Sequence, residues 1–117
     1  MVYFVVNYDR LTDAFGALAD PTRCAVVEVL ARHGEMAVSD LAAQHDMSLP
    51  GFLKHVRVLE RAGLLTTEKV GRTRRCRLVT PRLAEAERWI REHRVFWEAQ
   101  LASLDRFLQD STSGEEK

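Results

Sequence analysis

Basic side chains recur at helical spacing in the stretch MSLPGFLKHVRVLERAGLL, residues 47–65. At 100° per residue, Phe52, Val56 and Leu59 fall within about 40° of one another and form an apolar stripe. The opposite face carries Pro50, Lys54, Arg57 and Arg61. A helix packed by its apolar stripe would therefore turn a positively charged ridge toward solvent, which suits a polyanionic partner.

Duplex DNA is the polyanion that this geometry fits best. An α-helix enters the major groove of B-DNA, where Lys and Arg side chains bond to guanine O6 and N7. We expect Lys54, Arg57 and Ser48 to make the groove contacts, since Ser48 and the first backbone amides can also meet a phosphate. His55 either contacts a phosphate or packs at the rim of the apolar stripe. Gly51 weakens a helix by roughly 1 kcal/mol relative to Ala, a cost that is tolerated where backbone approaches DNA.

The net charge of zero hides a strong segregation of charge along the chain. Residues 1–53 carry three basic and seven acidic residues, a net −4, and residues 95–117 carry two and five, a net −3. Residues 54–94 carry twelve basic and five acidic residues, a net +7. Six basic residues and no acidic one occur in residues 69–82. Charged residues usually form a solvated face, but segregation this sharp beside a turn favours a polyanion partner.

Capping residues and periodicity predict four or five helices and one β-hairpin. Leu11, Phe15 and Leu18 recur at helical spacing in the first helix. Asp20 is expected to cap the second helix, with Pro21 in its first turn, and Gly34 to end it. The remaining helix signals are caps at Ser39-Asp40 and Ser48, a turn at Asp46-Met47 and a stop near Gly63.

After Gly63 the pattern becomes extended. In residues 65–70, Leu65, Thr67 and Lys69 alternate with Thr66, Glu68 and Val70, which predicts a strand. Gly71-Arg72-Thr73-Arg74 supplies a turn, and residues 75–79 return as a second strand. Arginines would then lie at the tip of the hairpin, beside the basic helix, where they can reach DNA phosphates or the adjacent minor groove. The expected contacts there are Arg72, Arg74 and Arg75.

From Pro81 to about Leu108 the pattern is helical again, with two adjacent apolar stripes. About 28 residues at ~1.5 Å per residue give a helix ~42 Å long, which exposes more apolar surface than one small domain covers. A second copy of the chain would bury the surplus. The tail DSTSGEEK, residues 110–117, is expected to be disordered. The predicted dimer interface comprises Leu11, Phe15, Trp89, Phe96, Trp97, Leu101 and Leu104.

The chain contains, in order, the segments ALADPTRCAVVEVL (17–30), DLAAQHDMSLPGFLKHVRVLERAGLL (40–65), GRTRRCRLVTP (71–81) and WIREHRVFWEAQLASLDRFL (89–108). Together these four segments resemble the arsenical-repressor (ArsR) family of winged helix-turn-helix transcription factors. The resemblance implies a mainly α fold with a β-hairpin wing (an α+β winged helix-turn-helix), with long terminal helices forming the dimer interface. It also implies a homodimeric repressor that binds an imperfect palindrome in its own promoter. One domain over residues 8–109 is expected, after an extension of residues 1–7.

The chain departs from that family at residues that bear on function. Leu53 stands where relatives tend to have Ser, and it can touch a thymine methyl but cannot donate a hydrogen bond. Cys24 replaces a common second Arg. The family's Cys-x-Cys metal site would fall at Ala37 and Ser39, which offer no thiolate. The other zinc site would fall at Thr80, Arg82, His93 and Phe96.

Only His93 among those positions is a zinc ligand, so the resemblance implies a branch without metal sites or any cofactor. Such a histidine usually serves as a surface or interface residue. Trp89, Phe96 and Trp97 could line a ligand pocket, although core and interface packing is the commoner use of such aromatics. The effector and the operator sequence are not given by the sequence.

Other function classes find little support. No apolar run approaches the roughly 20 residues that span a bilayer. Cys24 and Cys76 lie far apart without a CxxC pattern, which suits reduced thiols and a cytoplasmic location. The sequence has no phosphate-binding glycine motif and no recognisable catalytic arrangement, so an enzyme is not expected. Two alternatives stay open: a ligand- or thiol-responsive repressor, and a winged-helix protein-interaction module that does not bind DNA.

Overall fold

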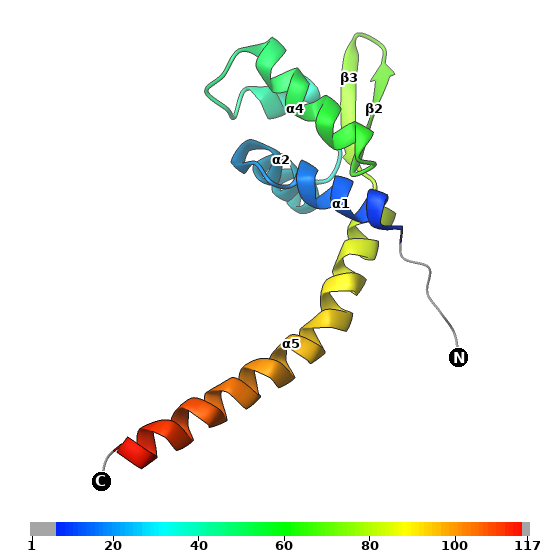
Figure 1. Ribbon diagram of the computed structural model, residues 1–117. Helices are drawn as coiled ribbons and strands as arrows, with labels where there is room; N and C mark the ends of the chain where they lie inside the picture. The colour runs from blue at the N-terminus through cyan, green and yellow to red at the C-terminus, as the bar shows by residue number, and fades with distance from the viewer. Residues whose placement is uncertain (1–6, 116–117) are drawn as a thin grey trace. The chain divides into compact units, whose positions relative to one another are not determined.

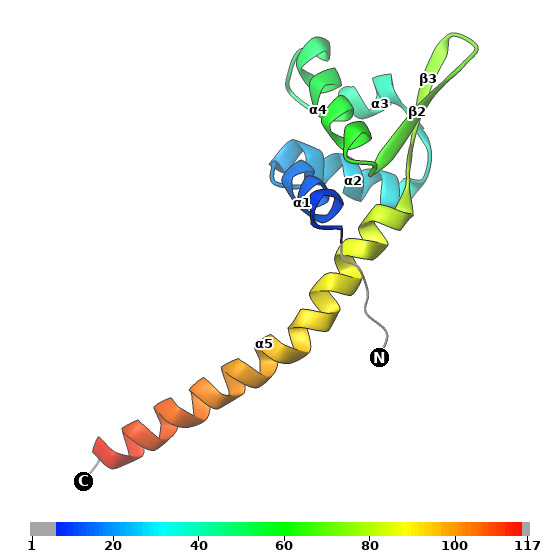
Figure 2. The same ribbon diagram turned by 45° about the vertical axis from the view of Figure 1, so that its right-hand side comes forward.

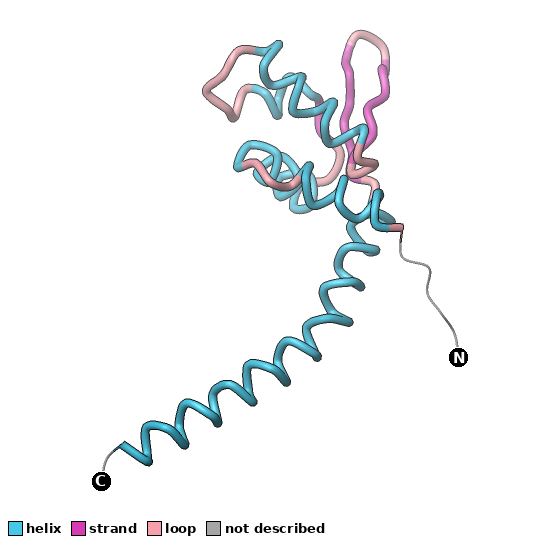
Figure 3. Tube along the Cα trace, in the orientation of Figure 1, coloured by secondary structure: helices cyan, strands magenta, loops and turns pink. Residues whose placement is uncertain are grey.

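The computed structural model describes residues 7–115 and divides into two compact units, the first ending at Ala86 and the second beginning at Glu87. Helices dominate, and a small antiparallel sheet accompanies them (Figures 1 and 3), which confirms the predicted fold class. The elements are α1 (Tyr8–Ala17), α2 (Pro21–His33), β1 (Met36–Ala37), α3 (Val38–Ala42), α4 (Leu49–Arg61), β2 (Leu65–Val70), β3 (Thr73–Leu78) and α5 (Thr80–Glu115).

The first two helices begin at side-chain caps. The Asp20 carboxylate accepts a hydrogen bond of 3.0 Å from the Arg23 backbone N–H, and Pro21 follows in the first turn, as predicted. Gly34 ends α2 with a φ of 78°, a conformation that glycine adopts without a Cβ clash. Asn7 caps α1 by accepting from the Arg10 N–H at 3.1 Å. Asn7 is therefore the cap of α1, and the rest of the expected extension, residues 1–6, lies outside the described residues.

The predicted cap of the third helix is wrong. Helix α3 begins at Val38, its N-cap is Ala37, and no side chain caps it. The reason is a short strand that the sequence did not indicate: Met36 and Ala37 pair with β3 opposite Cys76 and Arg75. Because β1 leads directly into α3, Ser39 lies within the first turn of the helix instead of in front of it.

The sheet has the order β1-β3-β2, and both pairings are antiparallel. The hairpin turn is shorter than predicted: only Gly71 and Arg72 separate β2 from β3, and Val70 pairs with Thr73 across the turn. Gly71 has a φ of 65°, which such tight turns require. Arg74 therefore lies on β3, opposite Lys69, and not at the tip.

The core of the first unit gathers side chains from all of its longer elements. Phe52 and Leu59 of α4 are fully buried, and Val56 keeps 4% of its surface exposed, so the predicted apolar stripe is confirmed. Helix α4 packs against α1, α2 and β2. The largest fully buried side chains are Phe52, Leu41, Leu59, Leu64, Leu65, Val26 and Cys76.

Helix α5 runs farther than predicted. It extends over 36 residues from Thr80 to Glu115, so the expectation of a disordered tail from residue 110 is wrong for residues 110–115. A formed helix gains one backbone hydrogen bond for each residue added, which lets it continue through residues with weak helix propensity. Residues 116–117 lie outside the described residues. Within the described part of the chain, no helix combines the length and apolar character needed to cross a membrane.

Candidate nucleic-acid interface

The exposed face of α4 carries the predicted basic ridge. Lys54, Arg57 and Arg61 are all exposed, and so is Pro50 in the first turn. Burial of the opposite stripe fixes which way the helix is turned, since rotating the ridge inward would expose Phe52 to water. The ridge therefore presents positive charge to solvent from Lys54 to the end of the helix at Arg61.

The start of α4 is held by Ser48. Its hydroxyl accepts a hydrogen bond of 3.2 Å from the Gly51 N–H, which confirms the predicted cap. A Cβ at position 51 would lie 3.1 Å from the Ser48 hydroxyl oxygen, closer than an ordinary contact. Gly51 thus leaves room for the cap itself, a role that the sequence did not suggest.

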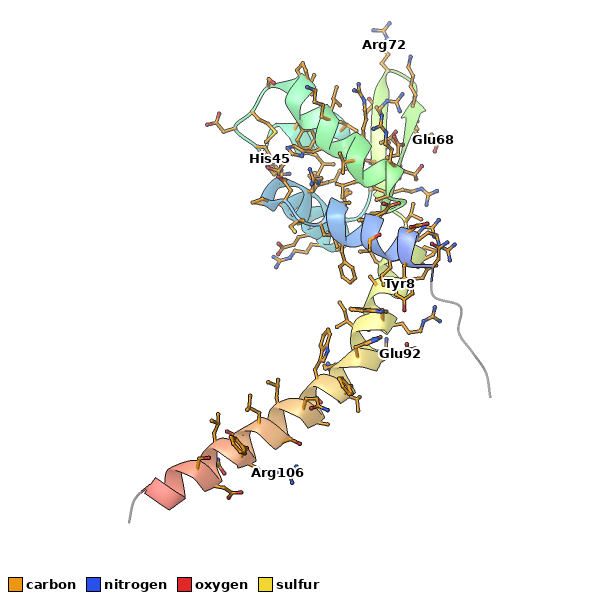
Figure 4. The ribbon with its side chains drawn as sticks, viewed as in Figure 1. Tyr8, His45, Glu68, Arg72, Glu92 and Arg106 are labelled. Carbon is orange, nitrogen blue, oxygen red and sulfur yellow. The ribbon has the colours of Figure 1, made fainter. Side chains whose placement is uncertain are left out.

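The three hairpin arginines have different surroundings, although they are almost adjacent in sequence. Arg72 lies at the tip of the hairpin (Figure 4). The Arg74 guanidinium donates to the Thr67 hydroxyl at 2.8 Å, and that hydroxyl donates to the Glu60 carboxylate at 2.9 Å. Arg75 is half-buried and pairs with the Glu35 carboxylate at 3.5 Å.

A groove of about 540 Å³ lies between α3, α4 and the hairpin, which Figure 2 shows side by side. Arg57, Arg72 and Arg74 converge on it. The structure therefore brings together two of the three hairpin arginines and one from the ridge, and it directs Arg75 toward Glu35 instead. The other lining residues are Val38, Ser39, Leu49, Leu53, Val56, Glu60, Thr67 and Thr73.

Sequence reasoning missed several of these groove residues. Ser39 is expected from the sequence to cap the third helix, and Leu53 to touch a thymine methyl. In the structure both line the groove, and Leu53 is half-buried against the core. No sequence pattern marked Thr67 and Glu60 as groove residues, because the hydrogen bonds that link them to Arg74 depend on the register of the hairpin. Only the alternation of β2 hinted at the face on which Thr67 lies.

His55 lies on the other edge of α4, against α2. Its Nδ1 is 3.1 Å from Nη1 of Arg23 and 3.7 Å from the Asp20 carboxylate. The hydrogen bond from the Arg23 backbone N–H lowers the pKa of Asp20 below its ordinary value. One side of the imidazole is therefore engaged in packing, and Arg23 is a residue that the sequence analysis did not single out.

The two cysteines occupy different environments. Cys24 is exposed, and its thiol lies 2.9 Å from the Leu18 carbonyl. Cys76 is fully buried in β3, between Met36 and Thr67 of the neighbouring strands. Burial raises the pKa of the Cys76 thiol to about 11, with a smaller contribution from Glu60. Cys76 therefore remains a protonated, unreactive thiol at neutral pH.

His93 is held within an aromatic cluster on α5. Its ring stacks on Trp89 at a centroid distance of 4.4 Å, and its Nδ1 donates to the Trp89 carbonyl at 2.8 Å. Trp97 approaches Trp89 edge-on, at 6.0 Å. Among the residues that the structure describes, no group of three or more His, Cys, Asp or Glu side chains is placed to hold a metal ion.

The residues predicted for a dimer interface differ in exposure and fall into three sets. Leu11 keeps only 6% of its surface exposed in a single chain, so it has little area to offer a partner. Phe15 and Trp89 are half-buried. The four others on α5 are exposed by 46–64%: Phe96, Trp97, Leu101 and Leu104.

A short helix, a turn and a second helix, followed by a β-hairpin with a basic edge, define a winged helix-turn-helix protein. A helix-turn-helix domain model matches residues 18–68. A solved crystal structure of an ArsR family transcriptional regulator is 41% identical, with 81% of this chain and 97% of that chain covered and a TM-score of 0.74. The chain belongs to the ArsR family of transcriptional regulators, a family of DNA-binding proteins and not of enzymes.

Two curated relatives agree with this assignment. An HTH-type transcriptional regulator from Mycobacterium tuberculosis is 44% identical over 68 residues, which cover 58% of this chain and 62% of that protein. The arsenical resistance operon repressor from Escherichia coli is 40% identical over 58 residues, half of each chain. The match thus spans about half to two thirds of these relatives' lengths.

The different burial of the two thiols predicts selective modification. In the folded protein at pH 8, an excess of a thiol-reactive disulfide reagent should modify one cysteine per chain quickly, because Cys24 is exposed and Cys76 is buried and protonated. Cys24→Ser should abolish the fast reaction, and Cys76→Ser should leave it. Two fast thiols per folded chain would contradict the placement of Cys76.

Proposed function

We propose that the protein is a homodimeric transcriptional repressor that binds a palindromic operator without metal control, in the cytoplasm where its DNA lies. The observation that carries this proposal is the convergence of Arg57, Arg72 and Arg74 on one groove beside the basic ridge of α4. Three cations around a groove between a helix and a hairpin suit a DNA backbone that passes between them.

With α4 in the major groove, Lys54 and Arg57 reach base edges and can pair with guanine O6 and N7. Ser48 and the first amides of α4 lie close to a phosphate, where the helix dipole favours negative charge. Arg72, at the hairpin tip, follows the DNA backbone or enters the minor groove. Arg74 is held toward the groove by Thr67, so its charge is already oriented before DNA binds.

Dimer formation is supported by the apolar face of α5. Trp97, Leu101 and Leu104 recur at spacings of four and three residues and are exposed by 46–64%. Such a stripe on a long helix is typical of pairing with an equivalent helix. Two-fold symmetry then presents two copies of α4 to successive turns of the duplex, about 34 Å apart, and requires a palindromic site.

Metal independence is supported by the residues at the positions where the family resemblance locates ligands. Ala37 offers no ligand atom, and Ser39 is a hydroxyl in the first turn of α3. His93 uses one ring nitrogen to donate to the Trp89 carbonyl, which leaves at most one nitrogen for a metal. A single imidazole does not make a zinc site.

DNA binding is tested with the purified full chain, by fluorescence anisotropy on duplexes from the region upstream of its own gene. We expect tight, sequence-specific binding that weakens steeply with salt. The double variant Arg72→Ala, Arg74→Ala should lower the slope of log K against log salt by about 1.8 for each bound subunit, since each phosphate contact contributes about 0.9.

The matched control is Arg32→Ala, an exposed arginine at the end of α2 that pairs with Glu28. It should leave the affinity and the salt slope unchanged. Equal affinity of the wild-type protein for upstream and shuffled duplexes would refute the repressor and favour a protein-interaction module. An unchanged slope in the hairpin variant would refute the assigned role of the hairpin.

The oligomeric state is tested by light scattering after gel filtration. Leu101→Asp combined with Leu104→Asp should give monomers at concentrations where the wild-type chain is a dimer, because dimerisation would bury unpaired carboxylates. Val70→Asp, at a residue with a similar exposure of 52%, should not alter the mass. A monomeric wild-type chain would contradict the proposed dimer.

Metal independence is tested on the same upstream duplex. Dialysis against EDTA should not change the affinity, and neither Zn²⁺ nor arsenite should release the protein from DNA, because the described residues lack a ligand set. Release by either ion, or loss of binding after chelation, would show that metal control is present.

A further inference from the structure

We infer that Arg23 is a positioning residue: it fixes the His55 imidazole in the form that donates from Nε2 to a DNA phosphate. The inference rests on the proposed DNA-binding function. It adds a DNA contact on the side of α4 that faces away from the hairpin. It starts from a contact between α2 and α4 that no motif indicated.

The hydrogen-bonding chemistry of arginine decides the form of the ring. Nη1 of Arg23 lies 3.1 Å from Nδ1 of His55. A guanidinium has only donors, so Nδ1 must be the acceptor. A neutral imidazole whose Nδ1 accepts carries its hydrogen on Nε2. The Asp20 carboxylate is farther from Nδ1, at 3.7 Å, and it already accepts from the Arg23 backbone N–H at 3.0 Å.

Arg23 is itself held in place by the end of α1. Its Nε donates to the Ala17 carbonyl at 2.6 Å, and its Nη2 donates to the Gly16 carbonyl at 3.4 Å. A cation at the last carbonyls of a helix is favoured by the helix dipole. The guanidinium therefore bridges α1, α2 and α4 through three acceptors, which leaves it little freedom to release His55.

The other nitrogen of His55 remains open toward solvent. The side chain keeps 24% of its surface exposed, and among residues 7–115 its ring makes polar contacts through Nδ1. In this part of the chain His45 Nε2 is buried without a hydrogen-bond partner, and His55 Nε2 does not share that state. A donor held by its neighbour and exposed to solvent is suited to an anionic oxygen.

The position of His55 on the helix indicates which anion it meets. At 100° per residue, His55 lies within about 40° of Ser48 and Gly51, on the edge of α4 away from the groove. The groove edge carries Leu53 and Glu60. With α4 in the major groove, the hairpin follows the phosphates of one strand, and the Ser48–His55 edge faces those of the other.

The ring form can be observed directly by long-range ¹H–¹⁵N NMR on the ¹⁵N-labelled full chain at pH 8. For wild type, His55 Nδ1 should resonate as an unprotonated ring nitrogen and Nε2 as a protonated one. Arg23→Met should produce a mixture of the two neutral forms. Arg32→Met, the matched control on the same helix, should leave the His55 signals unchanged. Protonated Nδ1 in the wild-type chain would overturn the inference.

DNA affinity is the second measurement. The amide NH₂ of Asn or Gln can replace one ring N–H of histidine, and it stays a donor because an amide has no tautomers of the imidazole kind. His55→Gln places a donor near the position of Nε2 and should keep the affinity within about threefold of wild type. His55→Asn reaches only the position of Nδ1 and should weaken binding by about tenfold for each bound subunit, as expected for the loss of one hydrogen bond to a charged oxygen.

A double-mutant cycle separates positioning from folding. With the two ring forms about equally populated, Arg23→Met should weaken binding by about twofold for each bound subunit, or about fourfold for a dimer, in the wild-type background. In a His55→Gln background, where no tautomer needs to be fixed, the same substitution should change the affinity by less than about twofold. A purely structural Arg23 would cost the same in both backgrounds, and that result would overturn the inference. If the wild-type chain binds no duplex, the proposed function fails, and so does the proposed contact of His55 with a DNA phosphate. The NMR experiment still decides which ring nitrogen of His55 carries the hydrogen.

Discussion

The burial of one face of α4 is the constraint on which the remaining arrangement depends. Phe52 and Leu59 are fully buried, and Val56 is nearly so, against α1, α2 and β2. Removing a side chain of this size from water stabilises the fold by roughly 1.5–3 kcal/mol, so the rotation of the helix about its axis is strongly fixed. Every polar residue of α4 then has a defined direction.

This fixed rotation gives α4 three usable surfaces. The ridge of Lys54, Arg57 and Arg61 faces solvent. One flank, with Leu53 and Glu60, closes the groove beside the hairpin. The other flank brings His55 to Arg23 and, through it, to the end of α1. A single amphipathic helix thereby links the hairpin on one side with the first two helices on the other.

The strand pairing of the hairpin decides which partner each of its arginines contacts. Alternation along β3 sends Arg74 to Thr67 and Arg75 to Glu35, so neighbouring arginines serve different purposes. Arg75 connects β3 to the loop before β1, which supports the strand that leads into α3. Arg74 and Arg72 remain at the groove, and the local cation density that the proposed DNA contact needs comes from these two together with Arg57.

The sequence by itself determined the parts of the protein that depend on local signals. The apolar stripe and basic ridge of α4, the caps at Asp20 and Ser48 and the glycine stop at Gly34 were all predicted, because each follows from helical periodicity or from hydrogen bonds within one turn. The segment order also sufficed to indicate the winged helix-turn-helix family.

Only the tertiary structure decided what depends on distant pairing. Strand β1 has two residues and no pattern of its own, so its pairing with β3, which moved the start of α3, could not be read from the sequence. The separate roles of Arg74 and Arg75 follow from register, and the contact of Arg23 with His55 joins residues 32 positions apart. Such contacts depend on how elements pack, and local sequence patterns encode only the elements themselves.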